Sequence, residues 1–71
     1  MILNMKALNK LLETRFDNNQ SEMARTLDVQ RTHLNKIFRN DGKGAGATIF
    51  GALIKYCNDN NLSVNNYIFF D

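Results

Sequence analysis

"NQSEMARTLDVQRTHLNKIF", residues 19–38, contains two short helical patterns separated by a single turn. Asn19 is a favourable N-cap for the first helix, and Glu22, three residues later, completes the pattern of a capping box. The apolar face of this helix consists of Met23, Ala24 and Leu27. Asp28 lies where the chain must reverse, and aspartate accepts left-handed backbone more readily than most residues. The stretch therefore predicts two helices joined by a tight turn.

The second helix of this stretch, expected over residues 30–39, has two faces when its residues are placed at 100° intervals. An apolar arc of about 100° can enter a core, and it contains Leu34, Ile37 and Phe38. A separate arc of about 140° has no acidic residue, and it contains Arg31, Thr32, Asn35, Lys36 and Arg39. These side chains can address base edges and phosphates in a major groove. The alternative is an ordinary solvent-exposed face.

The N-cap of this second helix is unusual. Gln30 occupies a position where Ser, Thr, Asp or Asn would stabilise the helix by about 1 kcal/mol. Either Gln30 serves a contact with a partner, or core packing sets the helix and the cap matters little.

Three more helices are expected around this stretch, and together they give an all-α fold of five short helices in a compact bundle. A leading helix follows the N-cap Asn4, and its buried positions are Ala7, Leu8, Leu11, Leu12 and Phe16. A fourth helix follows the N-cap Thr48, and its core positions are Ile49, Ala52, Leu53, Tyr56 and Cys57. Ser63 caps a final turn or two that ends in aromatic residues. The chain has no strand-like alternation of any length.

Length and composition limit the function to the surface of one small domain, residues 1–71, because so short a chain buries only about 60% of its unfolded surface. The net charge is +2, but residues 25–43 hold five basic and two acidic residues. The single Cys57 and the single His33 cannot build a zinc site, and a lone cysteine favours a reducing cytoplasm. The longest apolar run at the start of the chain is three residues, which predicts neither export nor membrane spanning.

The glycine-rich stretch "RNDGKGAGAT", residues 39–48, resembles a phosphate-binding loop but has the wrong spacing for one. A helix precedes it instead of a strand, and Lys43 is followed by glycine instead of Ser or Thr. As the connection after a DNA-reading helix, the loop can bring Lys43 and its backbone amides to a DNA phosphate. The alternative is a flexible spacer.

The stretch at residues 19–38 resembles the helix-turn-helix of the Cro and phage-repressor family, also called the XRE type. Gln20 matches the polar start of the first motif helix. The "E-L-A" core is matched by Glu22, Met23 and Ala24, and the "L-G-V" turn by Leu27, Asp28 and Val29, with Asp28 in place of the usual glycine. Leu34 and Ile37 match buried positions of the recognition helix. The resemblance covers residues 4–70 and implies a lambda-repressor-like fold.

The resemblance also implies binding of double-stranded operator DNA through the helix at residues 30–39. Family members contact phosphates and bases at positions that correspond here to Gln20, Gln30, Arg31, Thr32, Asn35 and Lys36. Arg39 and Lys43 are expected to hold further phosphates. Such regulators usually bind as dimers, and the expected protein interface consists of Tyr67, Phe69 and Phe70. We expect at least two of these three aromatic side chains to pack on the leading helix.

Among the relatives of this family, the chain is similar to the modulator-of-repression type of temperate phages of Gram-positive bacteria. That type acts together with a CI-type repressor, so the alternative function is an antirepressor that docks on the repressor's DNA-binding domain. The low net charge and the "YIFF" ending at residues 67–70 favour this alternative. Either regulator would act in the cytoplasm of the host cell.

An enzyme is not expected. The sequence has no pair of carboxylates at catalytic spacing, and His33 lies between the two faces of its helix with no evident partner. We therefore expect no catalytic residue, no metal ligand and no cofactor.

Overall fold

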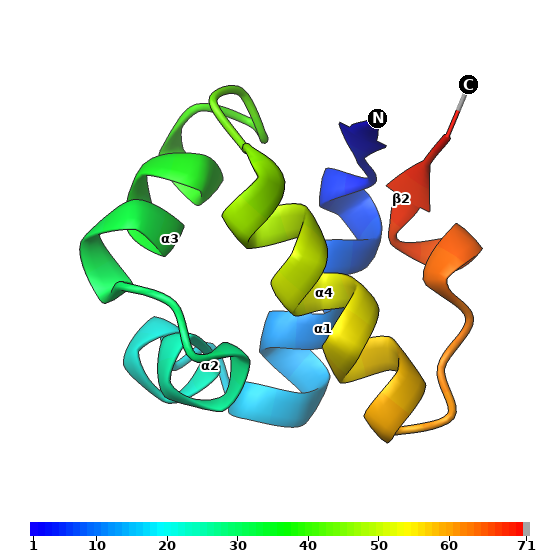
Figure 1. Cartoon of the computed structure of the whole chain (residues 1–71). Helices are drawn as coiled ribbons and strands as arrows, with labels where there is room; N and C mark the ends of the chain where they lie inside the picture. The colour runs from blue at the N-terminus through cyan, green and yellow to red at the C-terminus, as the bar shows by residue number, and fades with distance from the viewer. Residues whose placement is uncertain (71) are drawn as a thin grey trace.

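A computed structural model describes residues 1–70 and consists mainly of four α-helices. The elements in chain order are β1 (Ile2–Leu3), α1 (Met5–Phe16), α2 (Gln20–Leu27), α3 (Arg31–Arg39), α4 (Ala47–Asp59), a 3-10 turn η1 (Val64–Asn66) and β2 (Ile68–Phe69). Figure 1 shows α3 at one end of the molecule and both chain ends, together with β2, at the other. The predicted predominance of helix is confirmed.

The core forms where the apolar faces of all four helices meet. Its most deeply buried large side chains come from α2, α3, α4 and β2, and they are Met23, Ile37, Ile49, Leu53, Cys57 and Ile68. The predicted apolar face of α1 is buried except for Ala7, which is half-buried, and Ala52 of α4 is also half-buried. Phe50, which the sequence pattern did not place in the core, is buried as well. The burial of these faces leaves the polar faces of the helices in solvent.

The turn between α2 and α3 depends on a left-handed residue at Asp28, as the sequence predicts. Asp28 has φ 58° and ψ 45°. Its backbone N–H donates to the carbonyl of Arg25 at 3.2 Å, and the N–H of Val29 donates to the carbonyl of Ala24 at 3.0 Å. These two bonds form a Schellman motif, which satisfies carbonyls that the end of a helix would otherwise leave open. The motif fixes the direction in which α3 leaves α2.

Replacing Asp28 by glycine is expected to stabilise the protein by about 0.5–1 kcal/mol. Glycine removes the left-handed strain and also a negative charge at the C-terminal end of α2, and these gains exceed its larger entropy when unfolded. Urea unfolding of Asp28→Gly beside Asp28→Asn measures the effect, because asparagine removes only the charge. A glycine variant no more stable than the asparagine variant would contradict a strained turn.

The predicted N-caps of α1 and α2 are confirmed. The side-chain oxygen of Asn4 accepts a hydrogen bond from the backbone N–H of Ala7 at 3.3 Å, and that of Asn19 accepts from the N–H of Glu22 at 3.1 Å. The second half of the expected capping box is wrong, because the Glu22 carboxylate pairs with Arg25 at 2.7 Å instead of reaching back to the cap. Arg25 lies one turn further along the helix and carries the opposite charge, so it competes with the cap for the Glu22 carboxylate.

The start of α4 was predicted incorrectly. The helix begins at Ala47 with Gly46 as its N-cap, and the carbonyl of Gly46 accepts from the N–H of Phe50 at 3.1 Å. Thr48 therefore lies in the first turn instead of capping it. Glycine is an acceptable N-cap and alanine is the best helix former, so the helix extends further toward the N-terminus than the threonine indicated.

The fifth helix is also wrong, because residues 64–66 form a single 3-10 turn and the chain then becomes extended. β2 pairs antiparallel with β1, in the register Ile2 opposite Phe69 and Leu3 opposite Ile68. The N–H of Asn4 donates to the carbonyl of Tyr67 at 2.8 Å, and the Asn4 side chain donates to the carbonyl of Asn66 at 3.0 Å. The two ends of the described chain are thereby tied together.

Candidate nucleic-acid interface

The two predicted faces of α3 are separate in the structure. Leu34 and Ile37 are buried and Phe38 is half-buried against the core. On the opposite side, five side chains line one shallow hollow: Arg31, Thr32, Asn35, Lys36 and Arg39. This set equals the acid-free arc predicted from the sequence, so the fold places three cations around one concave helix face.

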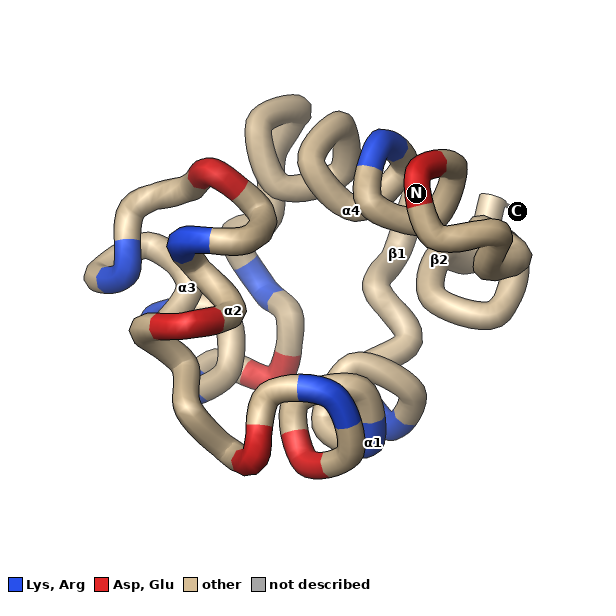
Figure 2. The backbone as a smooth tube through the Cα atoms, turned by 90° about the horizontal axis from the view of Figure 1, so that it is seen from below, with Lys and Arg blue, Asp and Glu red and all other residues tan. Residues whose placement is uncertain are grey.

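Basic residues are not confined to this face. Figure 2 shows lysines and arginines along α1 as well as on the side of the molecule formed by α2 and α3. Lys10 of α1, for example, lines a different hollow with Leu11 and Tyr67. No acidic side chain lines this α1 hollow or the α3 hollow, and what distinguishes the α3 hollow is that it holds three cations instead of two. Its local potential is therefore positive although the net charge of the chain is only +2.

Gln20 joins the α3 residues across the turn. It begins α2 and is half-buried. The side-chain Nδ2 of Asn35 donates a hydrogen bond to Oε1 of Gln20 at 3.0 Å. Both residues line a second hollow with Arg31 and the residues just before α2. The structure thus brings the predicted residue of α2 next to the predicted residues of α3, a link that the sequence pattern did not indicate.

Gln30 precedes α3 in extended conformation and is exposed, and its side chain makes no capping hydrogen bond. This agrees with the weak cap expected from the sequence. Because the carbonyl of Gln30 accepts from the N–H of Leu34 at 3.0 Å, the backbone already begins the helix without help from the side chain. The Gln30 amide is therefore available to a partner approaching this end of α3.

Lys43 lies apart from the other predicted DNA-binding residues. It is exposed in the loop after α3, and it lines a hollow with Leu3 and Phe50 near the beginning of the chain. The loop is shaped by Gly42, which has φ +87° and whose N–H donates to the carbonyl of Ile37 at 2.8 Å. A Cβ at Gly42 would lie 3.0 Å from Cγ and Sδ of Met5. The protein's own packing therefore explains this glycine.

The expectation that two of the terminal aromatic residues pack on the leading helix is wrong. Tyr67 is half-buried and lines a hollow against α1, but Phe69 and Phe70 are 52% and 47% exposed. The cause is the β1–β2 pairing: successive side chains of a strand point to opposite faces, so Leu3 and Ile68 enter the core while Ile2 and Phe69 face outward. Ile2 is 62% exposed and Met1 is 58% exposed. We call Met1, Ile2, Phe69 and Phe70 the terminal apolar patch.

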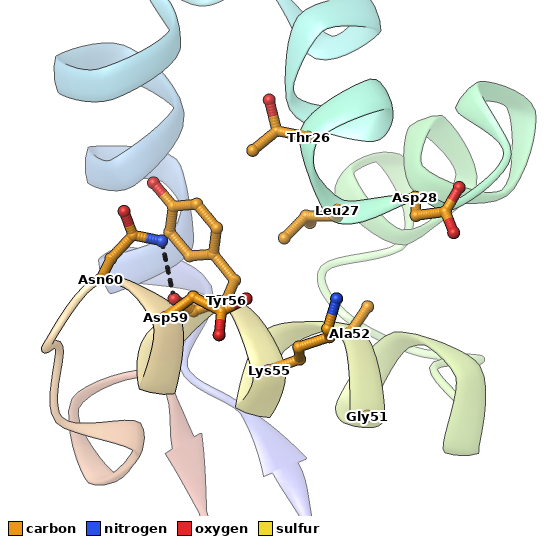
Figure 3. Close-up of a pocket in the computed structure, with 9 residues that line it drawn as sticks. All are labelled: Thr26, Leu27, Asp28, Gly51, Ala52, Lys55, Tyr56, Asp59 and Asn60. Carbon is orange, nitrogen blue, oxygen red and sulfur yellow. Dashed lines mark hydrogen bonds between the residues drawn. The ribbon is translucent and has the colours of Figure 1, made fainter.

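Another hollow lies between the C-terminal end of α2 and α4. Figure 3 shows Thr26, Leu27 and Asp28 on one side of it and residues of α4 on the other. At its far end, the side chain of Asn60 donates to the backbone carbonyl of Tyr56 at 2.8 Å. Asp28, Lys55 and Asp59 all line the hollow without pairing, since the Glu22 to Arg25 bridge is the one ion pair found within residues 1–70.

The remaining chemically distinctive side chains lie outside these hollows. Cys57 is buried in α4, and desolvation raises the pKa of its thiol. His33 is half-buried on α3. The part of the chain that the structure describes has no cluster of three or more His, Cys, Asp or Glu side chains arranged to hold a metal ion, and none of its helices has the length and apolar character to cross a membrane.

Comparison of the chain with protein-family models, with curated proteins and with solved structures gave no match.

Proposed function

We propose that this protein is a small regulator that binds double-stranded operator DNA, with α2 and α3 as a lambda-repressor-like helix-turn-helix. The observation that carries the proposal is the acid-free face of α3, on which three cations and two polar side chains line one hollow. A buried opposite face holds α3 against the core, so the exposed face is presented as a rigid surface. An α-helix with such a face fits the width of the major groove.

The proposed roles follow from the chemistry of each side chain. Arg31 and Lys36 suit the acceptor atoms of guanine, and Thr32 suits a thymine methyl group or a base acceptor. Gln20, Gln30 and Arg39 would contact phosphates that flank the groove, and Lys43 would reach a phosphate further along the backbone. The phosphate contacts would set the register of the protein on DNA, while the base contacts would read the DNA sequence. The proposed activity is binding and requires no cofactor.

The size of the protein favours a dimer on DNA. Its longest dimension is 28 Å, whereas neighbouring half-sites on one face of DNA are about 34 Å apart. One copy therefore reaches a single half-site, and a homodimer would reach two. With such a site upstream of its own gene, the regulator would serve the choice between lysogeny and lytic growth of a phage, in the cytoplasm of the host bacterium.

Titration of the purified protein against DNA from upstream of its own gene tests this function. If four phosphates are contacted, raising the salt from about 50 mM to about 200 mM is expected to weaken binding by about 100-fold. A duplex of scrambled sequence serves as the control, because phosphate contacts bind it while base contacts do not. Absence of salt-sensitive binding at micromolar protein would contradict the proposal.

The terminal apolar patch favours a second candidate, an antirepressor that docks on the DNA-binding domain of a CI-type repressor. Four large apolar side chains are exposed at the end of the molecule away from α3. Exposed aromatic side chains are frequent anchors of protein interfaces, and Tyr67 would flank them.

Light scattering of the protein mixed with such a repressor tests this candidate. The Phe69→Ser, Phe70→Ser double variant is expected to weaken the complex at least about tenfold, since two buried aromatic anchors would be lost. The same variant keeps α3 intact, so it should still bind a DNA duplex with a single half-site as the wild type does. A complex that the double variant forms with unchanged affinity would exclude docking through the patch.

A further inference from the structure

The hydrogen bond between Asn35 and Gln20 is the one contact between side-chain polar groups that connects two different helices within residues 1–70. Its length is 3.0 Å, from Nδ2 of Asn35 to Oε1 of Gln20, and both side chains are half-buried. It crosses from α3 to the first residue of α2. A half-buried bond of this kind is shielded from competing water more than an exposed one, so it restricts both amide groups.

This bond uses the atoms that Asn35 would need to read a base. Recognition of adenine by asparagine requires the amide N–H2 and the amide oxygen to face the base edge together. In Asn35 the Nδ2 group is directed at α2 instead. Reading a base in that way would therefore require the side chain to leave Gln20 and rotate toward the groove.

The same bond leaves the donors of Gln20 available. A glutamine amide has one oxygen that accepts and one nitrogen that carries two donor hydrogens. Because Oε1 of Gln20 accepts from Asn35, rotation of the amide is restrained, and the bond does not use Nε2. Arg31 lines the same hollow, whose one acidic side chain is that of Asp17. Two side chains with free donors therefore border this hollow at the junction of α2 and α3.

We propose that Asn35 is a positioning residue that orients the Gln20 amide so that its N–H2 group donates to a DNA phosphate. This inference rests on the proposed binding of DNA, and it changes the role that the sequence analysis gave to Asn35. Phosphate contacts hold the register of α3 in the groove. Asn35 then contributes to affinity through Gln20 and contributes nothing to sequence preference.

The two roles predict different losses. If Asn35 positions Gln20, Asn35→Ala weakens binding about three- to tenfold on operator and scrambled DNA alike, which is the usual range for one hydrogen bond. The dependence of affinity on salt stays unchanged, because neither Asn35 nor Gln20 carries a charge that displaces a counterion. If Asn35 reads a base, the loss is confined to the operator and the preference at one base pair disappears.

A double-mutant cycle with Gln20→Ala, Asn35→Ala and the double variant measures the coupling. The expected result is that the double variant binds no more weakly than Gln20→Ala alone. Asn35→Asp should bind more weakly than Asn35→Ala, because a carboxylate accepts one of the two donor hydrogens of Nε2 of Gln20 and also repels a phosphate. Asn9→Ala is the matched control, since the Asn9 side chain donates a similar bond, 2.9 Å long, to the carbonyl of Met5 on α1.

NMR of the free protein adds a measurement that does not depend on DNA. The side-chain amide protons of Asn35 should exchange slowly with water, and Gln20→Ala should remove that protection without lowering the melting temperature appreciably. Additive losses in the cycle, or a changed preference at a single base pair, would overturn the positioning role while DNA binding stands. Absence of salt-sensitive binding by the wild type would overturn the proposed function, and the positioning role with it.

Discussion

Arg31→Glu is expected to weaken DNA binding by about 100-fold, the largest effect of any single substitution on the proposed interface. Arg31 is the first residue of α3 and lines both hollows that border the α2–α3 junction. The substitution removes a charge-assisted contact and places a carboxylate against phosphates or base acceptors. Fluorescence anisotropy with labelled operator DNA measures the loss.

The position of Arg31 makes the result easy to interpret. A glutamate in the first turn of a helix interacts favourably with the helix dipole, and α3 has no acidic residue there. The variant should therefore fold at least as stably as the wild type. Lys10→Glu is the matched control: it makes the same change of charge on α1, beside Leu11 and Tyr67. Equal losses from both substitutions would mean that net charge, and not the face of α3, governs binding.

Leu53→Ala is expected to lower the free energy of unfolding by about 2–5 kcal/mol, because it empties a site in the middle of the core. Leu53 is 1% exposed and belongs to α4. A domain of this size has a total stability of only about 5 kcal/mol, so the variant is expected to keep at most about 3 kcal/mol and to melt at a much lower temperature than the wild type. Circular dichroism during thermal unfolding checks this, and loss of the far-ultraviolet helix signal should accompany it.

Lys55→Ala, two residues further along the same helix, supplies the comparison. Lys55 is exposed, and alanine is a good helix former, so its melting temperature should stay within a few degrees of the wild type. If Leu53→Ala were as stable as Lys55→Ala, Leu53 would not lie in the core, and another face of α4 would have to be buried.

Helical periodicity predicted α1 to α4 because each of these helices buries one apolar face, and burial leaves a repeat in the sequence that can be read locally. Asn4 and Asn19 were predicted correctly as N-caps because a capping hydrogen bond also acts locally, within three residues. The prediction of Thr48 as the N-cap was wrong because Gly46 and Ala47 also permit a helix start, and the local sequence does not decide between the two positions. The small sheet could not be predicted, because strands of two residues are too short for an alternating pattern.

The exposed face of α3 was predictable from the angles between its residues, and the structure places the same five side chains around one hollow. The bond from Asn35 to Gln20 could not be predicted, because it joins two helices whose relative direction is set by the turn at Asp28. The exposure of Phe69 and Phe70 could also not be predicted from sequence periodicity. For Phe69 it follows from the pairing with Ile2, which places its side chain on the face of the ladder opposite to that of Leu3 and Ile68.

The pairing of β1 with β2 also has a consequence for the order of folding. Leu3 and Ile68 are neighbours in space but lie at opposite ends of the sequence, so their contact must close a loop of nearly the whole chain. Because closing so long a loop costs conformational entropy, we expect this contact to form late in folding. The helices form from contacts that are close in sequence, and the ladder then seals the core over Ile68. Hydrogen exchange should accordingly find the amides of the ladder opening before those of the helices, in a partial unfolding that separates the two ends and leaves α2 and α3 intact.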